Sequence, residues 1–476
     1  MAQKNSLLSN LSWKFAERIS AQLVTMIVSI ILARMLEPSH YGIISIVTIF
    51  ITFANVFVSD GLGSALIQKK DADALDFSSV LWVNVLFSIV LYFILYFVAP
   101  YIAAFYGEGY EILTPVLRIL SFRLILSAIN SVQQAYVSKK MIFYKFFWAT
   151  LGGTVASAIV GIWMAYNNYG VWALVAQYLT NTTVDTVILG ISLRKKPLFR
   201  ISLQRLKILL KFGVHVLSTS LIITGYQELR ALIIGKVYSS ADLAYYDKGK
   251  QFPNLLITNV NSSIGSVLFP KLANEQDDIL KVKNITRNSI RFSSLLLSPL
   301  MMGLAAVSTP FVVVVLTEKW LPCVPLLQWF CIIYLFQPIH TANMQAIKAM
   351  GRGDILLKLE ITKKIIELIT IGATMFISVK AMVVGLAVIT TVFTFFNAYP
   401  NIKLLNYTIK EQLLDILPSI VMSLIMFIIV NFVGMFDIDN FLKLCLQVSV
   451  GIVVYLILCV ISKNKEFKYL MDFIKK

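Results

Sequence analysis

Few ionisable residues of this sequence lie inside its long apolar stretches, and Arg123 is the clearest of them. In a helix over residues 111–138 it lies roughly 18 to 22 Å of rise from either end, where a charge is costly in a bilayer. Asn130, Gln133 and Gln134 follow it. A guanidinium with amide neighbours could hold a pyrophosphate or an acidic sugar. The alternative is a structural ion pair with an acid of another helix.

Other polar residues in apolar stretches are candidates for the same path. The further candidate substrate-binding cations are Arg18, Arg118, Arg230 and Lys250. The candidate ion-coupling groups are Asp60, Asp185, Glu228 and His340. Asp60 and Asp185 are also the acids that could pair structurally with Arg123. Each candidate keeps a structural alternative: Arg18 could snorkel or pair with Glu17, and His340 could be a buried, hydrogen-bonded histidine.

The segments that must position these residues are helices in a membrane. The chain has 476 residues, of which 58% are hydrophobic and only 14% charged, whereas a soluble domain is about a quarter charged. We therefore predict an all-α, polytopic membrane protein with about fourteen transmembrane helices. The expected spans are 12–36, 40–68, 77–105, 111–138, 142–166, 169–193, 206–236, 241–270, 288–316, 322–349, 355–379, 381–403, 411–433 and 440–462.

Most of the Lys and Arg residues lie outside these spans, in the loops and at the two ends of the chain. The formal net charge is +17, and the cations gather in alternate loops, of which 194–207 is the most basic. The intervening loops, such as 100–110, have one cation at most. This distribution predicts that both termini face the cytoplasm. It argues against nucleic-acid binding, because no basic helix face or RNA-binding aromatic motif is present.

The chain also repeats itself. Residues 31–69 align without a gap on residues 233–271, with Phe50 on Phe252 and Lys69 on Lys271. A second match places Pro115 and Leu117 on Pro325 and Leu327. Helices one to six thus appear duplicated as seven to twelve, which predicts two like-facing bundles with a cavity between them. The expected domains are a six-helix bundle at 1–193, a basic cytoplasmic linker at 194–205, a second bundle at 206–404, and helices thirteen and fourteen with a tail at 405–476.

No catalytic or cofactor motif is visible. The sequence lacks a P-loop, an HExxH pair and a nucleophile elbow. The four cysteines have no metal-ligand spacing and lie in or beside apolar segments, as small buried hydrophobes do. We therefore expect neither an enzyme nor a cofactor or metal.

Two motifs flank the second expected span. LARMLEPSHYG ends at Gly42, and DGLGSALIQKKD begins at Asp60. Together they resemble the N-terminal signature of bacterial polysaccharide flippases of the multidrug/oligosaccharidyl-lipid/polysaccharide exporter superfamily, a MATE-like fold. The resemblance is strongest to the branch of O-antigen, colanic-acid and teichuronic-acid exporters, and covers residues 12–145 most densely.

The resemblance implies transport of a lipid-linked oligosaccharide, carried on undecaprenyl pyrophosphate, across the bacterial cytoplasmic (inner) membrane by alternating access. The product would serve surface polysaccharides such as lipopolysaccharide O-antigen. Polymerase or ligase proteins are the implied partners, beside membrane lipids. The alternatives are a cation-coupled multidrug exporter of the same fold, a lipid II flippase, or a membrane scaffold that does not transport.

Overall fold

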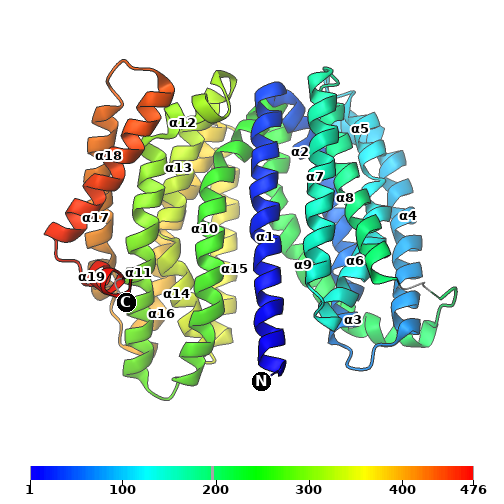
Figure 1. The fold of residues 1–476 in the computed structure, drawn as a ribbon, viewed down its shortest axis with the longest axis horizontal. Helices are drawn as coiled ribbons and strands as arrows, with labels where there is room; N and C mark the ends of the chain where they lie inside the picture. The colour runs from blue at the N-terminus through cyan, green and yellow to red at the C-terminus, as the bar shows by residue number, and fades with distance from the viewer. Residues whose placement is uncertain (1, 195–197, 475–476) are drawn as a thin grey trace. The chain divides into compact units, whose positions relative to one another are not determined.

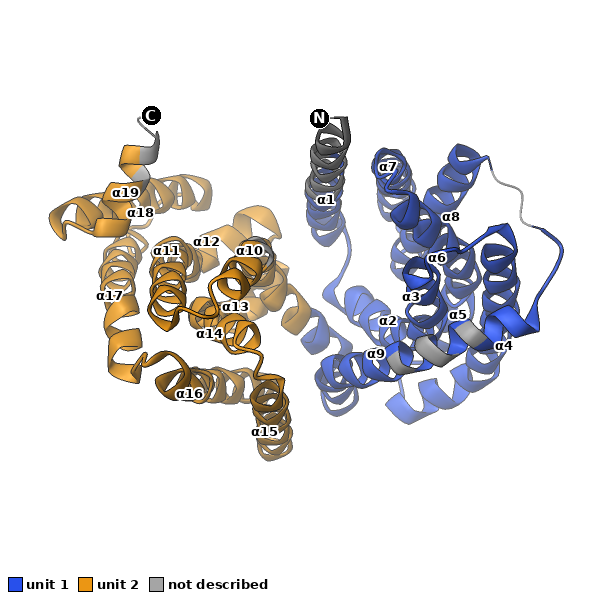
Figure 2. Cartoon of the chain, turned by 90° about the horizontal axis from the view of Figure 1, so that it is seen from below, with its two compact units in different colours: residues 1–244 blue, residues 245–476 orange. Residues whose placement is uncertain are grey.

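The computed structural model describes residues 2–194 and 198–474, and in this part of the chain every regular element is helical. Side chains are described there except at 2–12, 14–19, 208, 211, 212, 215, 263, 266, 470, 473 and 474. The chain divides into two compact units, 1–244 and 245–476, here called the N-terminal and C-terminal units. Figure 1 shows the fold and Figure 2 distinguishes the units by colour.

The N-terminal unit holds nine helices and the start of a tenth. They are α1 (Ala2–Met35), α2 (Pro38–Ser59), α3 (Gly61–Gln68), α4 (Ala74–Tyr106), α5 (Leu113–Leu120), α6 (Arg123–Lys140), α7 (Tyr144–Tyr166), α8 (Val171–Leu193), α9 (Leu203–Val237) and the first turn of α10 (Ser240–Asn274).

The C-terminal unit holds the rest of α10 and the remaining helices. They are α11 (Ile279–Ala306), α12 (Ser308–Val315), the 3₁₀ helix η1 (Glu318–Cys323), α13 (Val324–Leu335), α14 (Gln337–Ala349), α15 (Gly353–Thr374), α16 (Val379–Leu405), α17 (Ile409–Val433), α18 (Asn440–Ile461) and α19 (Lys465–Ile474).

Each of the fourteen expected spans coincides with one helix or with consecutive helices. Nine of these segments, counted over the described residues, are long and apolar enough to cross a membrane: α2–α3, α4, α5–α6, α7, α11, η1–α14, α16, α17 and α18. The other five expected spans correspond to α1, α8, α9, α10 and α15, which are helical but, over their described side chains, do not meet this combined length and hydropathy criterion; in α1 the described apolar part is the shorter segment Ser20–Met35. The chain is therefore a multi-pass helical membrane protein, while the count of fourteen spans stays a prediction.

Four of the expected spans are interrupted rather than continuous. The breaks fall at Asp60, at Ser121–Phe122, at Val307 and at Phe336. Pro338 stands in the first turn after the last of these breaks, where proline is tolerated because its missing N–H is not needed. No glycine or proline marks the break before Arg123, which is closed by bonds from Phe122 N–H to the Ile119 carbonyl and from Leu124 N–H to the Ser121 carbonyl.

Close backbone approach holds part of the N-terminal unit together. Gly42 of α2 faces the start of α10 so closely that a Cβ there would lie 1.7 Å from the Ser240 carbonyl oxygen. Gly61 of α3 and Gly213 of α9 also face one another: a Cβ on Gly61 would lie 3.2 Å from the Gly213 carbonyl oxygen, and a Cβ on Gly213 would lie 3.1 Å from the Gly61 carbonyl oxygen, closer than an ordinary van der Waals contact. Small residues allow such approach between helices. The glycines of the two sequence motifs are thus explained in part by packing.

Ion pairs connect the start of α4 to Lys69 and to the start of α9. Asp73 caps α4 by accepting from the backbone N–H groups of Leu75 and Asp76, and Arg205 of α9 donates to the Asp73 carboxylate at 2.5 Å. That hydrogen bond lowers the pKa of Asp73 to about 2. The neighbouring Asp76 is fully buried and accepts from Lys69 Nζ at 2.7 Å. These contacts fix the start of α9 against α4.

The core of the C-terminal unit forms where α11 packs on α13, α14 and α17. One cluster of buried residues joins Leu268 and Leu272 of α10 to Ile290 of α11, Ile339 of α14 and Tyr407. The helix α17 begins with a capping box, in which Thr408 and Glu411 satisfy each other's backbone N–H groups. This core brings α16 and α17 beside α11, where the unit's charged residues meet.

Candidate functional site

Two helices of the N-terminal unit turn polar faces toward each other. On α6, Arg123, Asn130 and Gln134 are seven and then four residues apart, which places them on one face of a helix. On α8, Thr182 and Asp185 are three residues apart and share a face in the same way. The two helices pack against each other. The membrane-spanning part of this unit therefore contains a polar seam, which we define by these five residues.

Arg123 occupies one end of the polar seam, directly after the helix break. Its Nε donates to Thr182 Oγ1 at 2.9 Å, and the guanidinium carbon lies 5.4 Å from the centroid of the Tyr178 ring. Among the residues that the structure describes, no carboxylate forms an ion pair with Arg123. A hydroxyl and an aromatic face orient the guanidinium but leave its charge uncompensated, so it can still attract an anion.

The other end of the polar seam is a hydrogen-bonded chain. The Asn130 side-chain amide, which is 6% exposed, donates to Asp185 Oδ2 at 3.1 Å. Gln134 donates in turn to Asn130 Oδ1. Asp185, one of the acids that sequence reasoning offered as a partner for Arg123, is thus engaged by an amide of α6. Asp185 therefore remains a candidate for ion coupling.

Gln133 lies beside the polar seam rather than in it. It lines a pocket of about 350 Å³ between the start of α4, α6 and the end of α8, with Asp73, Tyr136 and Lys140. Its Oε1 is buried and has no hydrogen-bond partner among the described atoms. A buried acceptor without a partner is costly unless water or a ligand satisfies it, so Gln133 is available to a polar group in this pocket.

Arg118 and Asp60 have local partners. Arg118 Nε donates to the Tyr96 carbonyl at 3.0 Å, and its guanidinium lies 4.2 Å from the centroid of the Tyr96 ring. Asp60 lies at the break between α2 and α3 and accepts from Ser59 Oγ at 2.8 Å. Both residues thus have the local contacts that the structural alternative predicts for them.

Four further candidates are not members of the polar seam as defined above. The Arg18 side chain on α1 is outside the described residues. Glu228 and Arg230 lie on α9, where both are partly buried and have interaction partners. Lys250 belongs to the C-terminal unit and is partly buried on α10.

His340 belongs to a polar layer of the C-terminal unit. Its Nε2 lies 3.0 Å from Thr394 Oγ1 of α16. Nearby, Asn343 of α14 donates to Gln412 Oε1 at 2.8 Å and accepts from Asn401 at 2.6 Å. Sequence reasoning missed this amide network, although the spacing of the α16 residues Thr394, Asn397 and Asn401 placed them on one helix face.

The principal charged cluster of the C-terminal unit was also missed. Asp415 of α17, whose side chain is 1% exposed, accepts from Arg287 at 2.6 Å and from Arg291, and from the Tyr407 hydroxyl at 2.7 Å. The signal was present in the sequence, because Arg287 and Arg291 are one helical turn apart in an apolar helix. The carboxylate is surrounded by donors, so the cluster is built to hold α11 and α17 together.

Metal chemistry has no visible support in the described part of the chain, where no group of three or more His, Cys, Asp or Glu side chains could hold a metal ion. The polar seam offers an uncompensated guanidinium, amides and a carboxylate at membrane depth. These groups can bind an anion or a polar headgroup reversibly by hydrogen bonds and charge.

The chain is similar along most of its length to proteins named for polysaccharide biosynthesis. The teichuronic acid biosynthesis protein TuaB of Bacillus subtilis is 24% identical over 422 residues, covering 86% of each chain. The lipopolysaccharide biosynthesis protein WzxC of Escherichia coli is 23% identical over 442 residues, covering 89% of this chain and 88% of the relative. The succinoglycan biosynthesis transport protein ExoT of Rhizobium meliloti is 22% identical, covering 97% and 94%.

The fold is shared with solved transporters. The lipid II flippase MurJ, in an inward closed conformation, superposes with a TM-score of 0.77 at 16% identity, covering 95% of this chain and 99% of that one. An inward-facing multidrug resistance MATE family transporter superposes with a TM-score of 0.60 at 15% identity, covering 81% and 95%. The model of the polysaccharide biosynthesis protein family matches residues 31–325, more than half of the chain, and the chain belongs to that family.

Proposed function

We propose that this protein is a flippase that carries a lipid-linked oligosaccharide repeat unit, attached to undecaprenyl pyrophosphate, across the cytoplasmic membrane. Family membership and the names of the relatives support a role in surface polysaccharide biosynthesis. The observation that carries the mechanism is Arg123, a cation within a membrane span that is oriented by Thr182 and Tyr178 and has no carboxylate partner among the described side chains.

The chemistry of a pyrophosphate suits this residue. A guanidinium presents planar, fixed N–H donors that match phosphate oxygens, and it stays charged at depth. Asn130, Gln133 and Gln134 supply amide donors and acceptors for the remaining phosphate and sugar oxygens. The polyprenyl tail would remain in the bilayer, so that only the headgroup needs a polar path.

The proposed transport cycle is alternating access, in which the headgroup site opens first to the cytoplasm and then to the outside. Both termini are proposed to be cytoplasmic, because the basic loops alternate along the chain. The proposed repeats are residues 1–193 and 206–404, joined by the linker 194–205, with 405–476 outside the duplication. Polysaccharide polymerase or ligase proteins would take the product, and the protein itself needs no cofactor.

Asp185 favours a second candidate, a cation-coupled multidrug exporter. It is a carboxylate on a membrane helix, held by the neutral Asn130, and a carboxylate of this kind can bind a cation or a proton. In the flippase, Asp185 would instead be the ion-coupling group, with Asp60, Glu228 and His340 as the other candidates. A lipid II flippase remains an alternative within the same mechanism.

Deletion of the gene tests the proposal. The expected result is loss of a surface polysaccharide and accumulation of its lipid-linked repeat unit, both restored by the wild-type gene. Restoration by Arg123→Lys should be partial and by Arg123→Ala absent, because lysine keeps the charge but not the fork of donors. Normal surface glycans together with new drug sensitivity would overturn the flippase and support the exporter. Accumulated lipid II would identify the peptidoglycan precursor as the cargo.

A further inference from the structure

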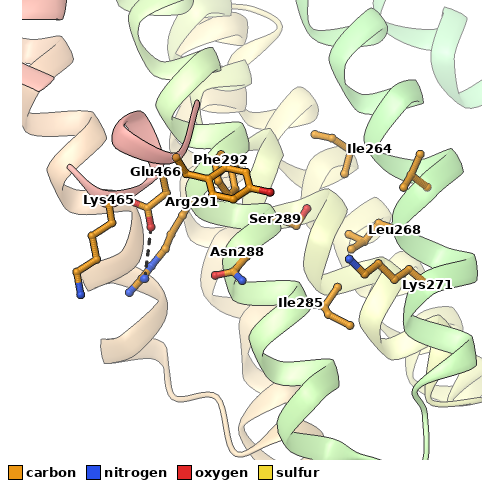
Figure 3. Close-up of a pocket in the computed structure, with 12 residues that line it drawn as sticks. Ile264, Leu268, Lys271, Ile285, Asn288, Ser289, Arg291, Phe292, Lys465 and Glu466 are labelled. Carbon is orange, nitrogen blue, oxygen red and sulfur yellow. Dashed lines mark hydrogen bonds and ion pairs between the residues drawn. The ribbon is translucent and has the colours of Figure 1, made fainter. Parts of the chain in front are cut away.

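A second pocket with charged lining residues lies in the C-terminal unit and includes Arg291 of the Asp415 cluster. It has a volume of about 600 Å³ and is enclosed by the end of α10, the middle of α11 and the terminal helix α19. Figure 3 shows its lining, with Lys271 reaching from α10 toward Ser289, and Arg291 meeting Glu466 on the opposite side. The pocket is large enough for a phosphate-bearing headgroup.

The two walls of the pocket differ in chemistry. The α10 wall presents the aliphatic side chains of Ile264, Val267 and Leu268. The α11 wall is mixed: it presents the amide of Asn288 and the hydroxyl of Ser289 together with Ile285 and Phe292. Apolar side chains beside an amide and a hydroxyl suit an amphiphile, whose chain contacts the former and whose headgroup is hydrogen-bonded by the latter. A fully hydrated small anion would gain nothing from the aliphatic wall.

The charges of the pocket leave two cations uncompensated. Arg291 is already neutralised, because it pairs with Asp415 and lies 3.4 Å from Glu466. Lys271 and Lys465 also line the pocket, and neither forms an ion pair with an acid in the part of the chain that the structure describes. In Figure 3 the two ammonium groups lie on opposite sides of the pocket, with Glu466 and Arg291 on the side of Lys465. Lys271 is therefore the uncompensated cation on the side of Ser289.

The helix α19 is fixed at this pocket by two contacts. The rings of Phe292 and Tyr469 meet edge to face with centroids 5.6 Å apart, and Glu466 pairs with Arg291. Only residues 462–464 separate α19 from α18, which is apolar enough to span the membrane. A short amphipathic helix that directly follows a span lies at the depth of lipid headgroups, so the pocket opens where headgroups are available.

We propose that this pocket binds the phosphoryl headgroup of an anionic lipid, with the phosphate at Lys271 and the first carbons of the chain against Ile264, Val267 and Leu268, while Lys465 adds positive charge at the opposite rim. Ser289 and Asn288 donate to the phosphate oxygens. The headgroup chemistry is shared by an anionic phospholipid of the bilayer and by a polyprenyl pyrophosphate. The site does not depend on transport and is distinct from Arg123.

The test measures lipid binding to the purified full-length protein in neutral detergent by native mass spectrometry. The probes are phosphatidylglycerol, phosphatidylcholine and undecaprenyl pyrophosphate. The wild type should bind both anionic lipids and not phosphatidylcholine. Lys271→Gln/Lys465→Gln should weaken this binding by about tenfold or more, because each lysine near a headgroup contributes to binding of anionic lipid. The matched control is Lys410→Gln/Lys468→Gln, which removes two exposed cations that do not line the pocket and should change binding less than twofold.

The source of the headgroup follows from the relative affinities. Preference for undecaprenyl pyrophosphate assigns the pocket to a polyprenyl carrier, and equal affinity assigns it to the bulk anionic lipid; both support the site. Equal binding of phosphatidylcholine, or unchanged binding by the double variant, overturns it. Both lysines are exposed or at the pocket rim, so a monodisperse, normally melting variant is expected. Arg123→Ala should lose export yet keep this binding, which separates failure of the site from failure of the flippase.

Discussion

Arg123 and Asp415 are each held by close neighbours, but in opposite ways. In the N-terminal unit, Arg123 has a hydroxyl and an aromatic ring as its contacts. In the C-terminal unit, Asp415 is enclosed by two guanidinium groups and a phenol. A charge that is matched by opposite charges holds helices together, whereas a charge that is only oriented stays available to a ligand. The comparison distinguishes a charge that is matched within the protein from one that we propose binds the substrate.

The largest expected effect is on stability, at Asp415. Asp415→Ala leaves Arg287 and Arg291 without their shared acceptor, and breaking a buried pair in this way costs about 3–5 kcal/mol. We expect a clear drop in the melting temperature of the purified protein. Asp354→Ala is the control, because it removes an exposed partner of Arg352 and should leave the melting temperature unchanged. Equal melting temperatures for the two variants would contradict a structural role for the Asp415 cluster.

The next effect is on export, at Arg123. Arg123→Ala should lower export of the repeat unit by about tenfold or more. It removes the guanidinium that we propose binds the pyrophosphate, and losing one partner of a buried charged contact is costly. Its melting temperature should fall less than that of Asp415→Ala. The measurement is surface polysaccharide per cell, normalised to the amount of protein in the membrane. A variant that melts early but exports normally would reverse the roles assigned to the two charges.

Packing in the N-terminal unit is tested by two motif glycines. Gly42→Ala places a Cβ on the Ser240 carbonyl, and such overpacking typically costs about 1–3 kcal/mol. Gly63→Ala meets no atom within 4 Å and should be neutral or slightly stabilising, because alanine favours a helix. Thermal melting of the two variants gives the comparison. If both destabilise equally, close backbone approach does not explain Gly42.

The smallest effect is on the pH dependence of stability, at Asp73. Its pKa is lowered to about 2 by the Arg205 hydrogen bond, so its contribution is complete above about pH 4 and is lost as the pH falls toward 2. The side chain is 53% exposed, so solvent screening limits the contribution to at most about 0.5 kcal/mol. Asp73→Asn keeps a helix cap without the charge. The difference in melting temperature between wild type and variant should therefore shrink between pH 5 and pH 3, and a constant difference would refute the ion pair's role.

The helical segments of this fold were predictable, because apolar runs of spanning length leave few alternatives. The breaks within them were not equally visible. Pro338 and Gly61 stand beside two breaks, and either residue could have signalled one. Nothing in Ser121-Phe122 signals the break before Arg123, because neither residue is a glycine or a proline and apolar residues stand on both sides of them. The interruption depends on tertiary packing, which a single sequence does not encode locally.

The sequence singled out four of the five residues of the polar seam, but it did not predict their contacts. Arg123, Asn130 and Gln134 share a helix face by spacing alone. Their partners Thr182 and Tyr178 were not singled out, because a threonine or tyrosine in an apolar helix is common and costs little. Asp185 was offered as a partner for Arg123, and which α6 side chain it meets depends on the axial register of α6 and α8. That register is set by packing and could not be read from residue types.

The break between α5 and α6 has a mechanical consequence. Around Ser121 and Phe122 the chain relies on contacts between residues three apart, so bending there disturbs fewer ladder bonds than bending within either rod. The short helix α5 can therefore tilt at this break while the hydrogen bond from Arg123 to Thr182 is kept. The N-terminal unit thus combines a compliant segment with a fixed anchor inside a single crossing of the bilayer.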